Sequence, residues 1–231
     1  MSNFLFPPAL PPSLPVLGSN RRFPVHRVYC VGRNFADHAR EMGAETPLEV
    51  PVFFSKPADS LVIGGGDMAY PLATEDLHHE VELVVALCAG SRGPVDRKTA
   101  TNMVFGHAVG VDLTRRDRQA EAKAGRLPWD VAKGFDRSAP ISALTAFEDW
   151  RPSDQSIWMD VNGERRQSGK LDQMIHDAAA AVSALSRLFE LRAGDLLFMG
   201  TPAGVGPLVP GDDWEAGIEG LPRLRGHILR D

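Results

Sequence analysis

The stretch His78-His79-Glu80-Val81-Glu82-Leu83-Val84-Val85-Ala86-Leu87 decides the fold of this chain. Successive side chains of a strand point to opposite faces, so Glu80 and Glu82 share one face and the alternating apolar residues from Val81 to Leu87 form the other. Two carboxylates on one face repel each other, and Asp112, thirty positions after Glu82, can add a third acid. A divalent cation such as Mg²⁺, Mn²⁺ or Ca²⁺ removes that repulsion, because hard cations take oxygen ligands. Taken alone, a Glu-x-Glu pair on a strand is usually just a solvated face, so the spacing by itself does not establish a metal site.

The composition of the whole chain is typical of a globular enzyme. Its 231 residues are 43% hydrophobic and 24% charged, and its formal net charge is −5. This negative charge argues against a nucleic-acid partner, which would require a clustered basic surface. No apolar run approaches the roughly 20 residues that cross a bilayer. The sequence therefore predicts a cytoplasmic enzyme without a nucleic-acid or membrane partner.

The domain organisation follows from the prolines. Residues 1–20 contain Pro7-Pro8, Pro11-Pro12 and Pro15, which disfavour helix interiors and central strands. We predict an extended N-terminal arm over residues 1–20, laid over the body or over a partner. Residues 21–231 are then a single catalytic domain, a size that buries a substantial core.

Apolar runs predict that the body consists mainly of strands with a few helices, an α+β arrangement. The expected strands cover residues 27–32, 51–57, 80–87, 108–113 and 195–199. Asn34 is placed to cap a short helix that ends at Gly43, and residues 99–103 can form a helical turn. Apolar residues at helical spacing predict one long helix between Gly169 and Gly194. Residues 64–66 are expected to form a glycine turn, and Cys30 and Cys88, both in apolar runs, are expected to be buried thiols of a reducing compartment.

Several polar residues could perform acid–base chemistry or bind an anion. His38 and Glu41 lie three apart on the expected helix, where a carboxylate can orient the imidazole as a base. An exposed polar pair has the same spacing. Lys133 is in a loop-like stretch, where a surface lysine is the ordinary outcome. Arg116 and Gln119 would share a face with Asp112 if the chain turns helical after it. Thr201 lies in a glycine-rich turn that could hold a carboxylate or could be purely structural.

Taken in order, five motifs of this chain resemble the fumarylacetoacetate hydrolase family. The resemblance covers roughly residues 27 to 212, and it is to the short, single-domain subgroup, with details most similar to the fumarylpyruvate hydrolases, or acylpyruvases. The motifs are Arg33-Asn34-Phe35-Ala36-Asp37-His38-Ala39-Arg40-Glu41, Lys56-Pro57, His79-Glu80-Val81-Glu82-Leu83, Asp112-Leu113-Thr114 through Gln119, and Gly200-Thr201-Pro202-Ala203-Gly204-Val205-Gly206.

The resemblance implies a β-sandwich roll around a divalent metal, Mg²⁺ or Mn²⁺ with Ca²⁺ also compatible, commonly in a homodimer. It implies roles for three groups of residues. Glu80, Glu82 and Asp112 would be the metal ligands. His38 and Glu41, on a lid segment near residues 34–47, would activate water, and Lys133 would assist the oxyanion. Arg33, Arg116, Gln119 and Thr201 would bind the substrate, a small 2-oxo or diketo acid.

The reaction implied is hydrolysis of the carbon–carbon bond of an acylpyruvate, foremost fumarylpyruvate to fumarate and pyruvate in aromatic (gentisate) breakdown. The same site could instead decarboxylate oxaloacetate or interconvert keto and enol forms, since both reactions pass through an enolate without activated water. A third hypothesis is a non-catalytic binding protein that a metal stabilises. The His38–Glu41 pair argues against it, because a binding module needs no general base.

Overall fold

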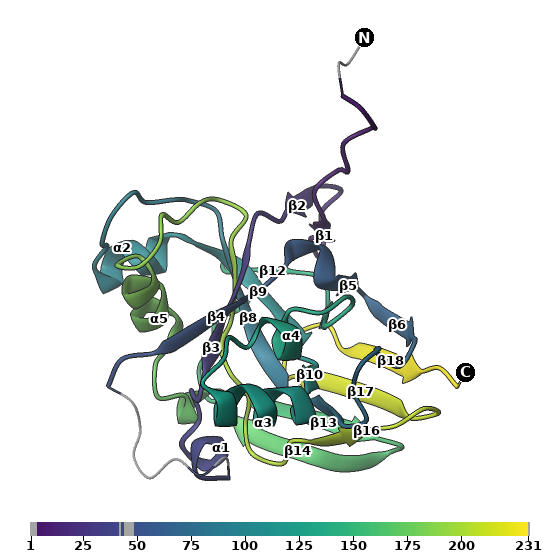
Figure 1. Cartoon of the computed structure of the whole chain (residues 1–231). Coiled ribbons are helices and arrows are strands. Elements are labelled where there is room, and N and C mark those ends of the chain that lie inside the picture. The colour runs from purple at the N-terminus through teal and green to yellow at the C-terminus, as the bar shows by residue number, and fades with distance from the viewer. Residues whose placement is uncertain (1–3, 42, 44–48, 231) are drawn as a thin grey trace.

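The computed structural model describes residues 4–41, 43 and 49–230, and strands dominate these parts of the chain (Figure 1). This confirms the prediction of a mainly β protein with few helices. The helices are α1 (Ala36–Glu41), α2 (Arg97–Asn102), α3 (Arg116–Gly125), α4 (Asp130–Lys133) and α5 (Ala178–Leu185), with 3₁₀ turns at Ala58–Ser60 and Leu171–Gln173. The strands are β1 (Ser13–Pro15), β2 (Arg22–Pro24), β3 (Val28–Gly32), β4 (Val52–Lys56), β5 (Leu61–Ile63), β6 (Gly65–Met68), β7 (Leu77–His79), β8 (Val81–Leu87), β9 (Val104–Val111), β10 (Thr114–Arg115), β11 (Ala139–Ile141), β12 (Thr145–Ala146), β13 (Ser156–Val161), β14 (Glu164–Lys170), β15 (Leu196–Phe198), β16 (Gly206–Leu208), β17 (Asp213–Ile218) and β18 (Leu224–Ile228).

The strands form one large sheet and three smaller ones. The large sheet has the order β4-β3-β15-β8-β9-β11-β5, with β12 also paired to β9. A five-stranded sheet, β14-β13-β17-β18-β6, packs against β8 and β9 of the large sheet. The strands β10, β7 and β16 form a three-stranded sheet, and β1 pairs with β2. Strand β8 is therefore central in the large sheet, between β15 and β9.

The central position of β8 explains why its carboxylate is buried. All seven of its residues are buried. Leu83 and Val85 belong to the core between the two larger sheets, whereas Val84 and Ala86 belong to a second core on the other face. A strand covered on both faces leaves no solvated face, so Glu82 is taken out of water together with its neighbours.

The long helix predicted between Gly169 and Gly194 is wrong in its first half. The chain continues as strand β14 to Lys170 and makes a 3₁₀ turn, and helix α5 starts only after Asp177, whose Oδ1 accepts a hydrogen bond from the backbone N–H of Ala180. The intervening segment instead pairs with the start of the lid region, since the Ile175 N–H donates to the carbonyl of Asn34 at 2.7 Å. Long-range pairing has thus overridden a helical pattern of apolar residues.

Asn34 does not cap a helix, in contrast to the prediction. Its amide nitrogen donates to the backbone carbonyls of Met199 at 2.7 Å and His176 at 2.9 Å, and its amide oxygen accepts from the His176 N–H at 2.8 Å. The side chain of Asn34 therefore ties together three segments that are distant in sequence. Helix α1 follows it directly and carries His38 and Glu41. The rest of the lid segment predicted for residues 34–47 lies partly outside the described residues.

Two smaller predictions also need correction. Gly65 and Gly66 are the first residues of β6, which pairs in parallel with β18, rather than part of a turn. A side chain at Gly65 would clash, because an added Cβ would lie 2.0 Å from the carbonyl oxygen of Arg225. Cys30 is buried as predicted, but Cys88 is exposed because it follows the last residue of β8.

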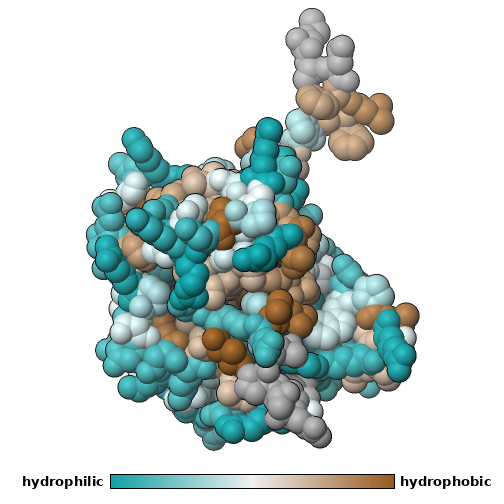
Figure 2. All heavy atoms as spheres, turned by 90° about the vertical axis from the view of Figure 1, so that its left-hand side faces the viewer, coloured by the Kyte–Doolittle hydropathy of each residue, from teal (hydrophilic) through white to brown (hydrophobic). Residues whose placement is uncertain are grey.

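The N-terminal arm is not uniform along its length. Leu14 of β1 is fully buried in the second core, and Leu17 donates its N–H to the carbonyl of Leu144 at 2.8 Å. Before this point the chain projects away from the body (Figure 1), and Leu5 and Leu10 are 96% and 90% exposed. Figure 2 shows the apolar side chains of this projecting part clear of the main surface. The homodimer stays a prediction.

Candidate active site

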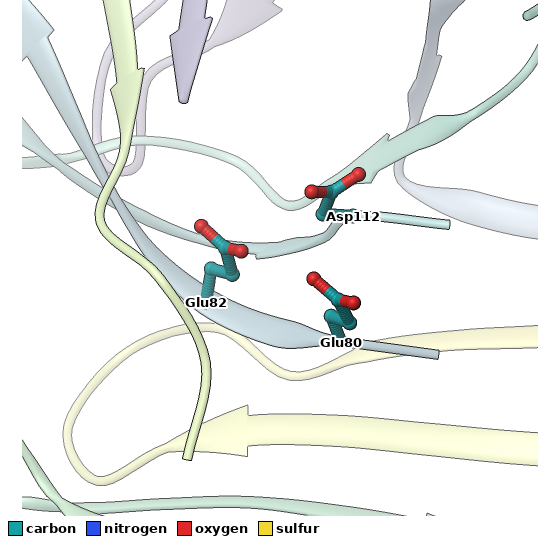
Figure 3. A group of neighbouring side chains, drawn as sticks. All are labelled: Glu80, Glu82 and Asp112. Atoms are coloured by element: carbon teal, nitrogen blue, oxygen red, sulfur yellow. The ribbon is translucent and has the colours of Figure 1, made fainter. Parts of the chain in front are cut away.

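Three carboxylates converge at one end of the β8–β9 pair (Figure 3). Glu80 lies between β7 and β8, Glu82 is in β8, and Asp112 follows the last residue of β9. Val81 is opposite Val111 in the antiparallel register, and the Asp112 N–H donates to the Glu80 carbonyl at 2.8 Å. The register therefore brings acids that are thirty positions apart to the same place.

The carboxylates fit a divalent cation. One oxygen from each of the three residues lies within 4.8 Å of the other two. Oxygen ligands that are each about 2.0–2.6 Å from a shared Mg²⁺, Mn²⁺ or Ca²⁺ ion are at most about 4–5 Å apart. The all-oxygen donor set is the type that these hard cations prefer. Glu80, Glu82 and Asp112 can thus bind a divalent metal.

The environment of Glu82 differs from that of Glu80. Burial raises the pKa of Glu82 well above its usual value, and the nearby charges of Asp112 and Glu80 raise it further. Burial would also raise the pKa of Glu80, but the opposing charges of Lys133 and Arg116 lower it well below its usual range. Glu80 therefore ionises more readily than an exposed glutamate, whereas Glu82 keeps its proton to a higher pH than an exposed glutamate does.

Metal binding is expected to depend on pH through Glu82. Because the pKa of Glu82 is raised, a cation must displace its proton at any pH below that raised value, and the affinity for Mn²⁺ falls about tenfold for each unit that the pH drops below it. The folding stability of the metal-free protein changes with pH in the opposite direction to the metal affinity. The protonated Glu82 contributes stability that is complete below the usual pKa of about 4.5. This contribution is lost as the pH rises through the raised pKa. Calorimetric titration with Mn²⁺ in two buffers of different ionisation enthalpy should count close to one proton released, and Glu82→Gln should release none. Binding without proton release across the acidic range would contradict this assignment.

Two buried lysines neutralise the carboxylates. The Nζ of Lys133 donates to Glu80 Oε2 at 2.8 Å, to Asp112 Oδ2 at 2.7 Å and to Thr114 Oγ1 at 2.6 Å. Lys56 Nζ lies 2.8 Å from Asp112 Oδ1 and donates to two backbone carbonyls. Burial disfavours the charged form of Lys133, but Asp112 and Glu80 outweigh it and raise its pKa. Lys133 is thus a buried cation, and the alternative of an ordinary surface lysine is wrong.

Arg116 is the third cation of the site. Its guanidinium donates to Glu80 Oε1 at 2.6 Å, to Gln119 Oε1 at 2.7 Å and to His78 Nδ1 at 3.3 Å. His78 can accept this bond because its Nε2–H is directed at Asp76 Oδ1, 3.0 Å away. Since the oxygen of the buried Gln119 amide is occupied by Arg116, its NH₂ group is left to donate to a ligand. Arg116 and Gln119 share a face of α3, as predicted. Helix α3 begins at Arg116, however, so Asp112 is not on it and is placed in the site by β9 instead.

Thr201 is oriented by Gln167, a buried side chain of β14. The Gln167 Nε2 donates to Thr201 Oγ1 at 2.7 Å and to the Pro202 carbonyl at 2.8 Å, and its Oε1 accepts from the Val81 N–H at 3.1 Å. These fixed backbone partners determine which amide atom is the donor. Because Thr201 Oγ1 accepts from Gln167, its own hydroxyl hydrogen is free to donate. Thr201 and Gln119 therefore both present donors, as binding of an anionic oxygen requires.

His38 and Glu41 form a hydrogen-bonded pair. His38 Nδ1 lies 3.1 Å from Glu41 Oε2, and the Glu41 carboxylate accepts a bond from the Gly204 N–H at 3.1 Å. Glu41 thereby attaches helix α1 to the glycine-rich turn that carries Thr201. A carboxylate on Nδ1 holds the proton there and leaves Nε2 as the basic atom. No bond to Nε2 is present among the described residues, and His38 is buried, so the pair is not an ordinary exposed one.

One pocket, open to solvent, brings together side chains from several of these elements. Its lining includes every predicted substrate-binding residue and the three side chains His38, Glu80 and Lys133. Sequence reasoning assigned no role to several residues that complete the site: Lys56, His78, Lys123, Trp129 and Gln167. Lys56, His78, Lys123 and Trp129 stand in or beside stretches that the sequence marks out, whereas nothing along the chain marks Gln167.

These features agree with comparisons against known proteins. The chain belongs to the fumarylacetoacetate hydrolase family, because residues 27–229 match the family model described as fumarylacetoacetate (FAA) hydrolase C-terminal. Among solved structures, it is similar to fumarylpyruvate hydrolase from Pseudomonas aeruginosa in complex with Mn²⁺ and pyruvate, with 45% identity, a TM-score of 0.96 and coverage of 99% of this chain and 100% of that one.

Curated relatives carry different activities. The mitochondrial oxaloacetate tautomerase FAHD1 of Mus musculus is 42% identical over 88% of this chain and 91% of its own length. The mitochondrial oxaloacetate decarboxylase of Dictyostelium discoideum is 41% identical over 84% of this chain and 89% of its own length. No helix in the described residues is both long and apolar enough to cross a membrane. A cytoplasmic location stays a prediction.

Proposed function

We propose that this chain is a metal-dependent hydrolase of acylpyruvates, with fumarylpyruvate as its principal substrate. The observation that carries the proposal is that the His38 imidazole, oriented by Glu41, lines the same pocket as the acidic residues Glu80 and Glu82. A carboxylate site that only bound a metal would have no need of an oriented base. The similarity to a fumarylpyruvate hydrolase over the full length supports the choice of substrate.

The charges of the site match the product of carbon–carbon cleavage. Three carboxylates are opposed by the three cations Lys56, Lys133 and Arg116, so with every group ionised the total is zero. A divalent cation held by Glu80, Glu82 and Asp112 makes the site doubly positive, and the enolate of a 2-oxo acid is doubly negative. When bound, that cation supplies Lewis acidity toward the 2-oxo and carboxylate oxygens of the substrate.

The residues of the chain then have the following roles. Gln119 and Thr201 donate hydrogen bonds to the 2-oxo acid end and orient it. His38 takes a proton from water at Nε2, and the resulting hydroxide attacks the distal carbonyl carbon. Lys133 stabilises the oxyanion that develops there, for which it must exchange one of its three present acceptors. The bond between the distal carbonyl carbon and the pyruvate methylene carbon breaks, and its electron pair stays on the pyruvate fragment. His38 then returns the proton to the methylene carbon.

The function is tested by turnover of fumarylpyruvate with and without a chelator. We expect cleavage to fumarate and pyruvate with Mg²⁺ or Mn²⁺, and its loss when the cation is removed and its return when the cation is restored. Acetylpyruvate and oxaloacetate, assayed in parallel, measure the preference between substrates. Undiminished turnover in excess chelator would disprove the metal role, and turnover of oxaloacetate alone would disprove the hydrolase.

The second candidate function is tautomerisation or decarboxylation of oxaloacetate on the same site. The curated names of the relatives favour it. It uses the same acidic residues and anion donors but needs no water activated by His38. Decarboxylation removes no proton from carbon, so it is the reaction that should depend less on His38 than hydrolysis does.

A further inference from the structure

An aromatic strip runs from the metal ligands to a second group of cations. Lys133 Nζ, which contacts Glu80, lies 5.1 Å from the centre of the Phe54 ring. The Phe54 and Trp129 ring centres are 5.9 Å apart, and Lys123 Nζ lies 5.6 Å from the centre of the Trp129 ring. All four side chains line the pocket. The pocket thus has a carboxylate-rich end, an apolar middle and a cationic end.

The cationic end consists of Lys123 and Arg33, and neither pairs with a carboxylate within the described parts of the chain. Both line the pocket and are partly buried. Burial lowers the pKa of Lys123, and the positive charges of Arg116 and Arg33 lower it further, so the two cations lie close enough to repel each other. Like charges that are brought together without a counter-ion are relieved by an anion.

The backbone at Arg33 supports a role in binding. Its φ of 59° is in the left-handed region, which few residues other than glycine adopt and which costs on the order of 1 kcal/mol. This residue follows β3 directly, between Gly32 and the triply bonded Asn34. The neighbouring strand and Asn34 therefore hold Arg33 in its unfavourable conformation at the pocket wall.

We propose that Arg33 and Lys123 form a subsite for a second carboxylate of the substrate, with Phe54 and Trp129 covering the carbon chain between the two ends. The inference rests on the proposed function, because it deepens the substrate class of the same pocket: 2-oxo acids that are dicarboxylates with an extended, unsaturated middle. Fumarylpyruvate has this form. Acetylpyruvate ends in a methyl group and leaves the cations unpaired.

The kinetic test compares two substrates in three variants. In Lys123→Gln, the ratio of kcat/KM for fumarylpyruvate to kcat/KM for acetylpyruvate should fall about tenfold, the loss expected for one partly buried charge pair. Most of this fall should lie in the KM for fumarylpyruvate. Lys123→Arg should keep the ratio within about twofold of wild type, and Lys98→Gln, at a remote lysine of α2, should change neither substrate. An unchanged ratio in Lys123→Gln, even with both rates reduced, would overturn the subsite.

A binding test separates this inference from the proposed function. The Mn²⁺-loaded protein is titrated with 2-oxopimelate, which has the chain length of fumarylpyruvate but no second carbonyl to attack, and with 2-oxoheptanoate, which ends in a methyl group instead. Wild type should bind 2-oxopimelate about tenfold more tightly, and Arg33→Gln or Lys123→Gln should remove this preference. If neither acylpyruvate is hydrolysed but the preference exists, the subsite holds and the proposed reaction fails. If hydrolysis is found without the preference, the reaction holds and the subsite fails.

Discussion

His38→Ala is expected to reduce hydrolysis of fumarylpyruvate by about 10²- to 10⁴-fold, the contribution of a positioned general base. Among the described residues of the pocket, His38 has a basic nitrogen, Nε2, that is oriented and has no hydrogen-bond partner. Glu41 orients the ring, because its Oε2 lies 3.1 Å from His38 Nδ1. The loss should fall on kcat, because the role proposed for His38 is to activate water and not to bind the 2-oxo acid end. Stopped-flow absorbance of fumarylpyruvate disappearance, at saturating Mn²⁺, measures it.

Two further variants make the His38 result specific. Glu41→Gln keeps a hydrogen-bond acceptor for Nδ1–H but removes the charge, so we expect a smaller loss than for His38→Ala. Asp37→Asn, on the same short helix, has an exposed carboxylate and should retain wild-type turnover. Metal-assisted decarboxylation of oxaloacetate, followed in the same samples, should survive the loss of His38, because it needs no general base. If hydrolysis persists in His38→Ala, the role proposed for His38 is wrong.

Asp112→Asn is expected to abolish tight Mn²⁺ binding and to lower the free energy of unfolding by about 3–5 kcal/mol, the usual cost of breaking a buried ion pair. Asp112 is fully buried and lies 2.8 Å from Lys56 and 2.7 Å from Lys133. Lys133 keeps Glu80 as a partner, but Lys56 is left with backbone carbonyls alone. Because Asp112 also raises the pKa of Glu82, Glu82 ionises more readily in the variant, which places the loss toward the lower end of the range. Urea unfolding of the metal-free protein measures it.

A double variant shows whether the unpaired lysine is the cause. Lys56→Met combined with Asp112→Asn removes both charges, so its loss of stability should be smaller than the sum of the two single losses by at least 1 kcal/mol or so. Glu121→Gln, an exposed carboxylate of α3, is the matched control and should cost less than about 1 kcal/mol. Strict additivity of the two single variants would show that Lys56 and Asp112 do not stabilise each other.

The sequence predicted the parts of this protein that depend on neighbours along one element. The two-residue spacing of extended chain brought Glu80 and Glu82 together, although β8 itself begins at Val81. The three-residue spacing placed His38 beside Glu41, because both relations are local along the chain. The same local reasoning failed for residues 169–177. Their apolar spacing suits a helix, but residues 169 and 170 end strand β14, and a hydrogen bond to Asn34 and a β-bridge to Phe35 hold the segment around Met174 and Ile175 in an extended form.

Only the tertiary structure decided the electrostatics and the support of the site. The sequence alone predicts a surface lysine at Lys133, but α4 places its side chain against Glu80 and Asp112. The sequence predicts no role for Gln167, but β14 brings its side chain to Thr201 and Val81. The physical reason is that burial and pairing between elements set the charge state of a side chain, whereas local spacing sets only its direction. The sequence by itself therefore determined which carboxylates could meet and where the base lies. Packing determined that the pKa of Glu80 is lowered, that the pKa of Glu82 is raised, and that Lys123 and Arg33 line one pocket without a carboxylate partner among the described residues.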